Sequence, residues 1–401
     1  MKGRNRGRKA SSARRNAGDL VAGPLPISNR APRAAIISLV TRRFSVPARL
    51  ALALLLFFSL DALAFRTGWY VSILEPNSTA GFLETILHNE MRRPIGRHLQ
   101  VLALGDSRMG LKPRVANVLA ANTNCSFGTI SVPGTTPRCW YYMLRQVDPA
   151  CDRYAAILVP LDSFDDRTWE DMSSRDLDLN YLAPLLRVTD FPRFVLSYPT
   201  WPGRASAAEA VLLKGLVYQH DVQAFLEHPH TRLEYVRLQE EHAREWYYNA
   251  VWERHSLAGM SVDWHAHTVA LPDWLEPAKR TEIEHVLLDD PPPDSPSYTR
   301  YRLRWLGAIL DRYRGSRTRF IFLRLPRGPV VRPDPPPNPA SSVRQFAAAG
   351  RIELLPEHLF DSLERPELFG DALHVNEEGG YEFSMMLAGE VGRLLAPPGD
   401  R

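Results

Sequence analysis

Two short segments near opposite ends of the folded part of the chain contain residue types that together perform acyl-ester chemistry. Gly105-Asp106-Ser107 follows a short apolar run, and Asp371 precedes His374 by three residues. A serine hydroxyl is a weak nucleophile unless an imidazole removes its proton, and a carboxylate orients that imidazole. The residue types therefore predict Ser107 as a nucleophile, His374 as its base and Asp371 as the group that orients His374.

The elements that must position these residues are strands and helices in alternation, which predicts a parallel sheet sandwiched by helices. The expected strands are 99–104, 125–132, 154–161, 319–325 and 352–355. The expected helices are 113–119, 137–146, 301–312, 343–349 and 377–395. Open α/β sheets bind ligands at the carboxyl ends of their strands, where N–H groups at a helix start also bind a developing oxyanion. Ser107 follows the first strand and His374 precedes the last helix, so both are expected at this edge.

Residues 162–298 interrupt the alternation with a polar, aromatic-rich stretch. We interpret this stretch as a mainly helical insertion that caps the carboxyl edge of the sheet. Helical periodicity over 232–252 predicts one long helix within it. Residues 291–296 and 329–339 are proline-rich and are predicted to be connectors, because proline disrupts helix interiors and central strands.

The N-terminal part of the chain has a different composition from the rest. Residues 1–49 contain twelve Lys or Arg and one acid, and Leu50–Leu60 is apolar except for Ser59. We predict a disordered basic tail over 1–47, a membrane-spanning helix over 48–66 and an extracytoplasmic domain over 67–401. The positive-inside rule places the tail in the cytoplasm and the domain in the periplasm or outside the cell.

The residues that flank this apolar stretch are expected at the membrane surface. Arg49 and Arg66 can extend their side chains to the head groups, and Trp69 and Tyr70 are expected in the interfacial layer. Two other interpretations stay open. Asp61 favours a buried helix of the globular domain, and Ala62-Leu63-Ala64 is compatible with the cleavage site of a signal peptide.

Composition limits the class of protein. With 45% hydrophobic and 23% charged residues, the chain is neither a polytopic membrane protein nor wholly disordered. The net charge of +4 comes from the N-terminal tail, so the folded part is not expected to bind nucleic acid.

Cysteines and histidines give weaker signals. Cys125, Cys139 and Cys151 are compatible with one disulfide and one thiol, or with three small buried residues. The histidine pairs of the insertion are interpreted as surface residues, with no metal or organic cofactor expected; they are His228 with His230 and His265 with His267.

Several polar and aromatic residues have both a functional and a structural interpretation. Arg108 either contacts an anionic substrate group or lies on a helix surface. The segment Asp165-Asp166-Arg167 either lines a cleft or forms a solvated loop. The aromatic residues of the insertion either stack on sugars or lie near lipid, or they form the core of the cap; they are Trp246, Tyr247, Tyr248 and Trp252.

The order and position of these motifs resemble the SGNH, or GDSL-type, hydrolase superfamily, specifically its single-pass membrane-anchored members. The resemblance covers 99–161 and 317–395, outside the insertion. Gly105-Asp106-Ser107 matches the nucleophile block, and 369–379 resembles the Asp-x-x-His block that is followed by an asparagine and a glycine, here Asn376 and Gly379. The resemblance implies a flavodoxin-like three-layer sandwich.

The middle blocks of the family match less completely. Gly134 occupies the place of the oxyanion-hole glycine, so the resemblance implies an oxyanion hole made by Ser107 and Gly134. Where the family has an asparagine that donates to the oxyanion, this chain has Asp162. An ionised aspartate only accepts hydrogen bonds, and losing one such donor costs about 10² to 10³ in kcat. Asp106, Arg108 and Asp162 are the other candidate cleft residues.

The resemblance implies a serine-dependent acyl-ester hydrolase or O-acyltransferase that acts through a Ser107 acyl-enzyme. The acyl group is expected to be acetyl and the substrate an acylated glycan or other ester of the cell envelope. Transfer would need water exclusion by the cap and an acyl donor, supplied by a membrane-embedded partner. The alternative, motivated by Asp162, is a non-catalytic protein of the same fold that binds or assembles envelope polymers.

Overall fold

The computed structural model describes residues 46–119, 123–168, 171–242, 254–290 and 292–396. The chain divides into two units, Met1–Phe57 and Phe58–Arg401. The sheet, the insertion and the candidate site all belong to the second unit.

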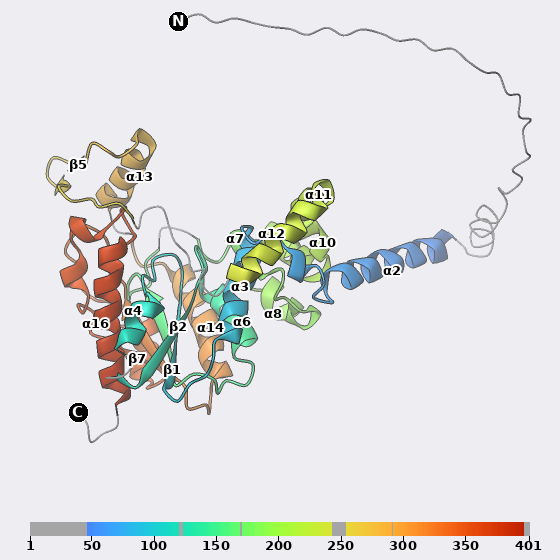
Figure 1. The fold of residues 1–401 in the computed structure, drawn as a ribbon, viewed down its shortest axis with the longest axis horizontal. Coiled ribbons are helices and arrows are strands. Elements are labelled where there is room, and N and C mark those ends of the chain that lie inside the picture. The colour runs from blue at the N-terminus through green and yellow to red at the C-terminus, as the bar shows by residue number, and fades with distance from the viewer. Residues whose placement is uncertain (1–45, 120–122, 169–170, 243–253, 291, 397–401) are drawn as a thin grey trace, which may run out of the picture. The chain divides into compact units, whose positions relative to one another are not determined.

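The centre of the second unit is a five-stranded parallel sheet with the order β2-β1-β3-β6-β7 (Figure 1). Its strands are β1 (Leu99–Gly105), β2 (Cys125–Ser131), β3 (Ala156–Leu161), β6 (Arg319–Arg324) and β7 (Glu353–Leu354). The expected α/β class and parallel sheet are confirmed. Numbered along the chain, the order is 2-1-3-4-5, a common order of doubly wound sheets that bind ligands at the carboxyl edge.

Helices cover both faces of this sheet, because alternate residues of each strand point to opposite sides. Leu102 and Leu104 pack in one buried cluster, while Val101 and Ala103 pack in another. The first cluster includes residues of α3 (Thr79–Arg92), α6 (Pro137–Val147), α14 (Pro296–Arg312) and α15 (Ser342–Ala348). The second includes residues of α4 (Pro113–Val118) and α16 (Glu377–Leu395).

The insertion between β3 and α14 is largely helical, as expected. Its helices are α7 (Leu177–Leu182), α8 (Phe191–Val195), α9 (Trp201–Leu212), α10 (Lys214–Val217), α11 (Gln219–Glu227), α12 (Pro229–His242) and α13 (Pro277–Leu288). It also contains a hairpin that the sequence pattern did not predict, β4 (Ser261–Asp263) with β5 (Thr268–Ala270). A short 3₁₀ helix lies within the insertion at Val188–Asp190. Others lie outside it, at Val71–Ile73, Asp361–Leu363 and Pro366–Leu368.

The structure describes one predicted helix of this region in part and moves one predicted boundary. The predicted helix over 232–252 is described only as far as His242, and Trp246, Tyr247, Tyr248 and Trp252 lie outside the described residues. The proline-rich connector ends at residue 295, because Pro296 begins α14 and Ser295 caps it. Proline is tolerated at the first helical position, where its missing N–H has no intrahelical partner.

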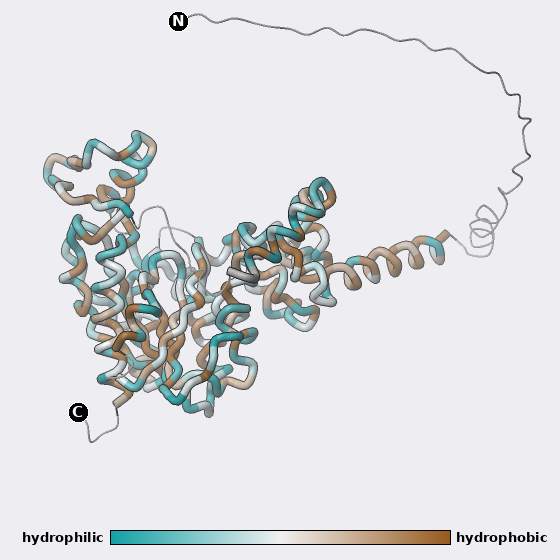
Figure 2. Tube along the Cα trace, in the orientation of Figure 1, coloured by the Kyte–Doolittle hydropathy of each residue, from teal (hydrophilic) through white to brown (hydrophobic). Residues whose placement is uncertain are grey.

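The N-terminal helix α2 (Val46–Phe65) is long and apolar enough to span a membrane, as Figure 2 shows by its hydrophobic colouring. Its 20 residues correspond to roughly 30 Å, about the thickness of a bilayer's hydrocarbon core.

The last turns of α2 contact the insertion rather than head groups. Asp61 is buried and accepts a 2.8 Å hydrogen bond from the Gly215 N–H. Arg66 donates to the carbonyl oxygens of Val211 and Leu212 at 2.5 and 3.1 Å. The expected head-group role of Arg66 is therefore wrong, because its guanidinium caps the end of α9.

The two aromatic residues that follow α2 also differ in their environments. Trp69 is 58% exposed, whereas Tyr70 is buried and its hydroxyl donates to Asp221 at 2.5 Å. The Tyr70 ring packs against Phe65 and Tyr218, so this side chain is not open to its surroundings as Trp69 is.

The three cysteines are free thiols. Cys125 and Cys139 belong to the clusters on opposite faces of the sheet, and Cys151 is half-buried. Burial raises the pKa of the Cys139 thiol well above its usual value. The structure therefore corresponds to the interpretation without a disulfide.

Candidate active site

The turn after β1 depends on Gly105. This glycine has a φ of +153°, and a Cβ at this position would lie 2.7 Å from Met109 Cβ and 2.9 Å from Pro160 Cγ. Only a residue without a side chain fits between β3 and the segment after Ser107. The turn thus fixes the position of Ser107 at the end of the strand.

We expect Gly105→Ala to lower the free energy of unfolding by about 1–3 kcal/mol, because the new methyl group overpacks this contact. Thermal unfolding of the full-length protein measures the effect. Gly389→Ala is the matched control: Gly389 lies in α16, where a Cβ would have no neighbour within 4 Å, so alanine there should stabilise by about 0.5–1 kcal/mol. Equal stability of the two variants would contradict the packing argument.

Ser107, His374 and Asp371 form a continuous hydrogen-bonded chain. Ser107 Oγ lies 2.8 Å from His374 Nε2, although the two residues are 267 positions apart. His374 Nδ1 lies 2.9 Å from both carboxylate oxygens of Asp371. This is the geometry in which an imidazole can remove the proton of a serine hydroxyl while a carboxylate fixes its tautomer.

The Asp371 carboxylate is held by its own turn as well as by His374. Oδ1 accepts hydrogen bonds from the N–H groups of Leu373 and His374 at 2.9 and 2.8 Å. Burial alone would raise the pKa of Asp371, but these hydrogen bonds and His374 hold it below its usual value. Asp371 is therefore a stable anion beside the imidazole.

The start of α16 explains the other residues of this motif. Asn376 caps the helix by accepting a hydrogen bond from the Gly379 N–H at 3.0 Å, and it donates to the Glu367 carbonyl at 2.7 Å. A Cβ on Gly379 would lie only 2.3 Å from the Leu368 carbonyl oxygen. Both residues therefore hold the turn that carries His374 against the preceding loop.

Gly134 lies in a turn that is tied to the end of β1. The Val132 N–H and the Thr135 hydroxyl both donate to the Gly105 carbonyl, at 3.0 and 2.9 Å. Gly134 has a φ of +69°, in the left-handed region that favours glycine. Within the described ranges, neither the Ser107 N–H nor the Gly134 N–H donates a hydrogen bond to another protein group.

The insertion fixes the two peptide groups around Gly134. Tyr181 of α7 donates a short hydrogen bond to the Pro133 carbonyl, and Arg175 Nη1 donates to the Gly134 carbonyl at 2.9 Å. Because C=O and N–H point in opposite directions in a trans peptide, Tyr181 orients the Gly134 N–H away from itself. Sequence reasoning missed Tyr181 and Arg175, since nothing in their local pattern indicates contact with a distant turn.

Arg108 lies between two carboxylates, and not on an open helix surface. Its guanidinium donates to Asp106 at 2.6 Å and pairs with Asp162 at 2.5 Å. Burial alone would raise the pKa of Asp106, but Arg108 holds it below its usual value. The charge of Asp162 is thus partly balanced by Arg108, one residue after Ser107.

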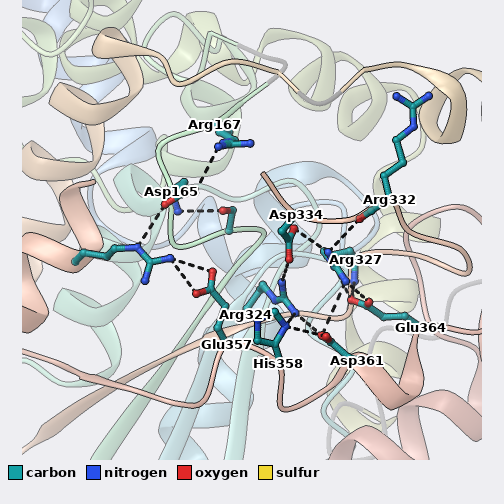
Figure 3. Close-up of polar contacts among 12 residues, drawn as sticks. Asp165, Arg167, Arg324, Arg327, Arg332, Asp334, Glu357, His358, Asp361 and Glu364 are labelled. Atoms are coloured by element: carbon teal, nitrogen blue, oxygen red, sulfur yellow. Dashed lines mark hydrogen bonds and ion pairs between the residues drawn. The ribbon is translucent and has the colours of Figure 1, made fainter. Parts of the chain in front are cut away.

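The Asp165-Asp166 pair neither lines a cleft nor lies in a solvated loop. Both side chains are buried. Asp166 accepts from the N–H and hydroxyl of Ser342 at 2.8 and 2.5 Å, and Asp165 accepts from the Asn338 N–H at 3.0 Å. They fasten the loop before α15. Arg167 pairs with Asp165 (Figure 3) and also with Asp294.

The loop after β6 is held by a second group of ion pairs. Arg324, at the end of β6, pairs with Asp334 at 2.7 Å and also with Asp361, while Arg327 pairs with Glu364 (Figure 3). A Cβ on Gly328 would lie 3.0 Å from the Ala372 carbonyl, inside the Asp371–His374 turn. The ion pairs therefore hold this loop against the turn that carries the imidazole.

An open groove of about 790 Å³ is lined by Arg167 after β3, by the turn between β4 and β5, by the segment before α14 and by the loop after β6. Its lining is Arg167, Trp264, His267, Asp290, Pro292, Pro293, Asp294, Arg332, Pro333 and Pro335. Arg167 follows Asp162 by five residues, and Arg332 follows Gly328 by four, so the groove begins within roughly 18 Å of the candidate site on both sides. Arg332 stacks over the ring of Trp264 at 4.7 Å.

The histidine pairs of the insertion lie at the surface. His228, His230, His265 and His267 are all exposed. No group of three or more potential metal ligands occurs among the residues that the structure describes.

Comparison with known proteins adds no relative: the chain matches no family profile, no curated protein and no solved structure.

Proposed function

We propose that this protein is a serine-dependent acyl-ester hydrolase or O-acyltransferase of the SGNH type. Ser107 attacks the acyl carbonyl, its proton passes to His374 Nε2, and the acyl group becomes bonded to Ser107 Oγ as the alcohol leaves with a proton from His374. Water or an acceptor hydroxyl then attacks the acyl-enzyme and gives its proton to His374. The bond between the acyl group and Ser107 Oγ breaks, Ser107 takes that proton back from His374, and the acid or the acylated acceptor leaves. Asp371 keeps the imidazole in the required tautomer.

The observation that carries the proposal is the unbroken Ser107–His374–Asp371 chain, with distances of 2.8 and 2.9 Å. A turn and a helix cap far apart in sequence produce it at the carboxyl edge of the sheet. The free N–H groups of Ser107 and Gly134 are suited to hold the oxyanion, and Tyr181 orients the second of them.

The substrate class rests on the membrane helix and the groove. An N-terminal span with a basic tail favours a domain on the periplasmic or extracellular side, where ester groups of envelope glycans occur. The proline rings offer apolar faces to a sugar, and Arg167, Asp290 and Asp294 offer polar edges to its hydroxyl groups. An acetylated glycan is therefore the substrate or acceptor that we propose.

A second candidate function is a non-catalytic envelope-binding or assembly protein of the same fold. The observation in its favour is Asp162, whose carboxylate cannot donate to an oxyanion. The ion pair between Asp162 and Arg108 weakens the argument for a non-catalytic function, because the negative charge of Asp162 is partly balanced.

The deciding experiment is to trap the acyl-enzyme. Full-length protein in detergent is exposed to an activated acetyl ester, quenched in acid and mapped by mass spectrometry. We expect one acetyl group on Ser107, absent from Ser107→Ala.

Ser131→Ala is the matched control, because Ser131 ends the neighbouring strand in register with Gly105 and should leave the adduct intact. An adduct that persists in Ser107→Ala, or none in folded wild type, would favour the non-catalytic function. Faster loss of the adduct with an oligosaccharide would indicate transfer.

A further inference from the structure

A buried ion pair lies just beyond the turn over residues 132–136 that carries Gly134. Arg138 of α6 and Asp178 of α7 both have fully buried side chains, and Arg138 Nε lies 3.4 Å from Asp178 Oδ2. Burial raises the pKa of the Asp178 carboxyl, and the charge of Arg138 opposes that rise. Since each side chain needs the other to balance its charge, the pair holds both in place.

The insertion also fixes Arg138 from other sides. Arg138 Nη2 donates to the carbonyl oxygens of Met172 and Ser173 at 3.2 and 2.7 Å. The guanidinium carbon lies 4.1 Å from the centre of the Tyr198 ring. The start of α6, which follows the Gly134 turn directly, is therefore joined to the insertion through one buried side chain.

The Thr136 hydroxyl connects this ion pair to the turn. It donates to Asp178 Oδ2 at 3.0 Å and accepts from the Tyr301 hydroxyl at 2.8 Å. Thr136 is 2% exposed and follows Gly134 by two residues. The end of the turn is thus held by a carboxylate of the insertion.

The two residues of α7 that contact the turn share one face of the helix. Asp178 and Tyr181 are three positions apart, and residues at this spacing are neighbours on a helix surface. Tyr181 bonds to the Pro133 carbonyl and Asp178 bonds to Thr136, so α7 holds the chain on both sides of Gly134.

We propose that Asp178, held by Arg138, is a positioning residue for the Gly134 N–H and acts through the Thr136 hydroxyl. Tyr181 sets the peptide group before Gly134, while Asp178 sets the residue that ends the turn. A displaced N–H costs more in the transition state than in the substrate complex, because the oxyanion is fully charged only in the former. The inference rests on the proposed function, since it assigns a role in the reaction at Ser107.

The test removes the connecting hydroxyl and keeps the ion pair, because loss of Asp178 itself would leave Arg138 as an unpaired buried charge and destabilise the fold. In full-length Thr136→Val we expect kcat for an activated acetyl ester to fall about 10-fold with KM unchanged, less than the loss of a whole oxyanion donor costs. Deuterium exchange of the amides in 132–136 should quicken by about 10-fold, which one net hydrogen bond is worth in an opening equilibrium.

Two variants serve as controls. Thr136→Ser keeps the hydroxyl and should return kcat and the exchange rate to within about two-fold of wild type. Thr318→Val removes a similar hydrogen bond at the other edge of the sheet, where Thr318 Oγ1 donates to the Tyr154 carbonyl at 2.7 Å before β6. It should leave both values within about two-fold of wild type.

Unchanged exchange in Thr136→Val would overturn the proposal whatever the rate of reaction. Faster exchange with kcat retained, an equal loss of kcat in Thr318→Val, or no recovery in Thr136→Ser would overturn it as well. If wild type neither hydrolyses the ester nor forms the Ser107 adduct, the proposed function fails. The exchange data then still decide the structural claim: faster exchange supports Asp178 as the residue that holds the turn, and unchanged exchange contradicts it.

Discussion

His374→Ala is expected to lower kcat/KM for an activated acetyl ester by on the order of 10⁴ to 10⁶, because Ser107 then has no base. The residual rate should resemble that of Ser107→Ala, since the two residues act as one unit. Steady-state hydrolysis by the full-length protein measures the effect. Similar rates for His374→Ala and wild type would contradict the proposed mechanism.

The chain contains a matched control for this variant. His358 Nδ1 lies 2.8 Å from Asp361 Oδ2, three residues away, which repeats the spacing of the His374–Asp371 pair at an exposed histidine. His358→Ala should change kcat/KM by less than about two-fold, because it leaves intact the Arg324–Asp361 pair that holds the loop after β6. A large loss in this variant would mean that the assay reports folding instead of chemistry.

The low pKa of Asp371 predicts how the stability of the fold depends on pH. Because the pKa of Asp371 lies below its usual value, the carboxylate supports His374 at every pH above that range. Its contribution to stability is present above the unfolded pKa and is lost as the pH falls through the folded pKa.

Asp162→Asn is expected to raise kcat for ester hydrolysis by about 10- to 100-fold, because an amide adds the oxyanion donor that a carboxylate cannot provide. The amide oxygen can still accept from Arg108, so the position of the side chain should be kept. Comparison of initial rates at saturating ester measures the change in kcat.

Asp162→Ala separates the effect of the missing donor from the effect of the negative charge, because it removes the charge without adding a donor. A rise in the asparagine variant alone supports the missing donor, whereas equal rises in both variants would assign the effect to charge. No rise in either would contradict the idea that Asp162 limits hydrolysis.

The parts of the site that could be predicted from sequence are those fixed by local pattern. Ser107 follows a buried strand, and His374 precedes a capped helix, so strand and helix signals placed both at one edge. The contacts of Arg108 with Asp162 and of Tyr181 with Pro133 could not be predicted. They join side chains across segments whose relative placement depends on tertiary packing.

The insertion was harder to predict for the same reason. The Asp165-Asp166 pair has the composition of a solvated loop, yet both carboxylates are buried because Ser342 and Asn338 bring donors from another loop. Arg66 likewise has the position of a head-group anchor, but free carbonyls at the end of α9 lie within its reach. In each case a distant polar partner decided the outcome.

The hydrogen bond from Tyr181 to Pro133 couples the cap to the reaction centre. The residue that orients the Gly134 N–H belongs to the insertion and not to the sheet, so the proposed oxyanion hole is incomplete without the insertion. A chimera that exchanges the insertion to change substrate preference would therefore also have to supply a hydroxyl at the place of Tyr181. In the proposed mechanism, substrate selectivity and reaction rate would therefore depend on the same segment.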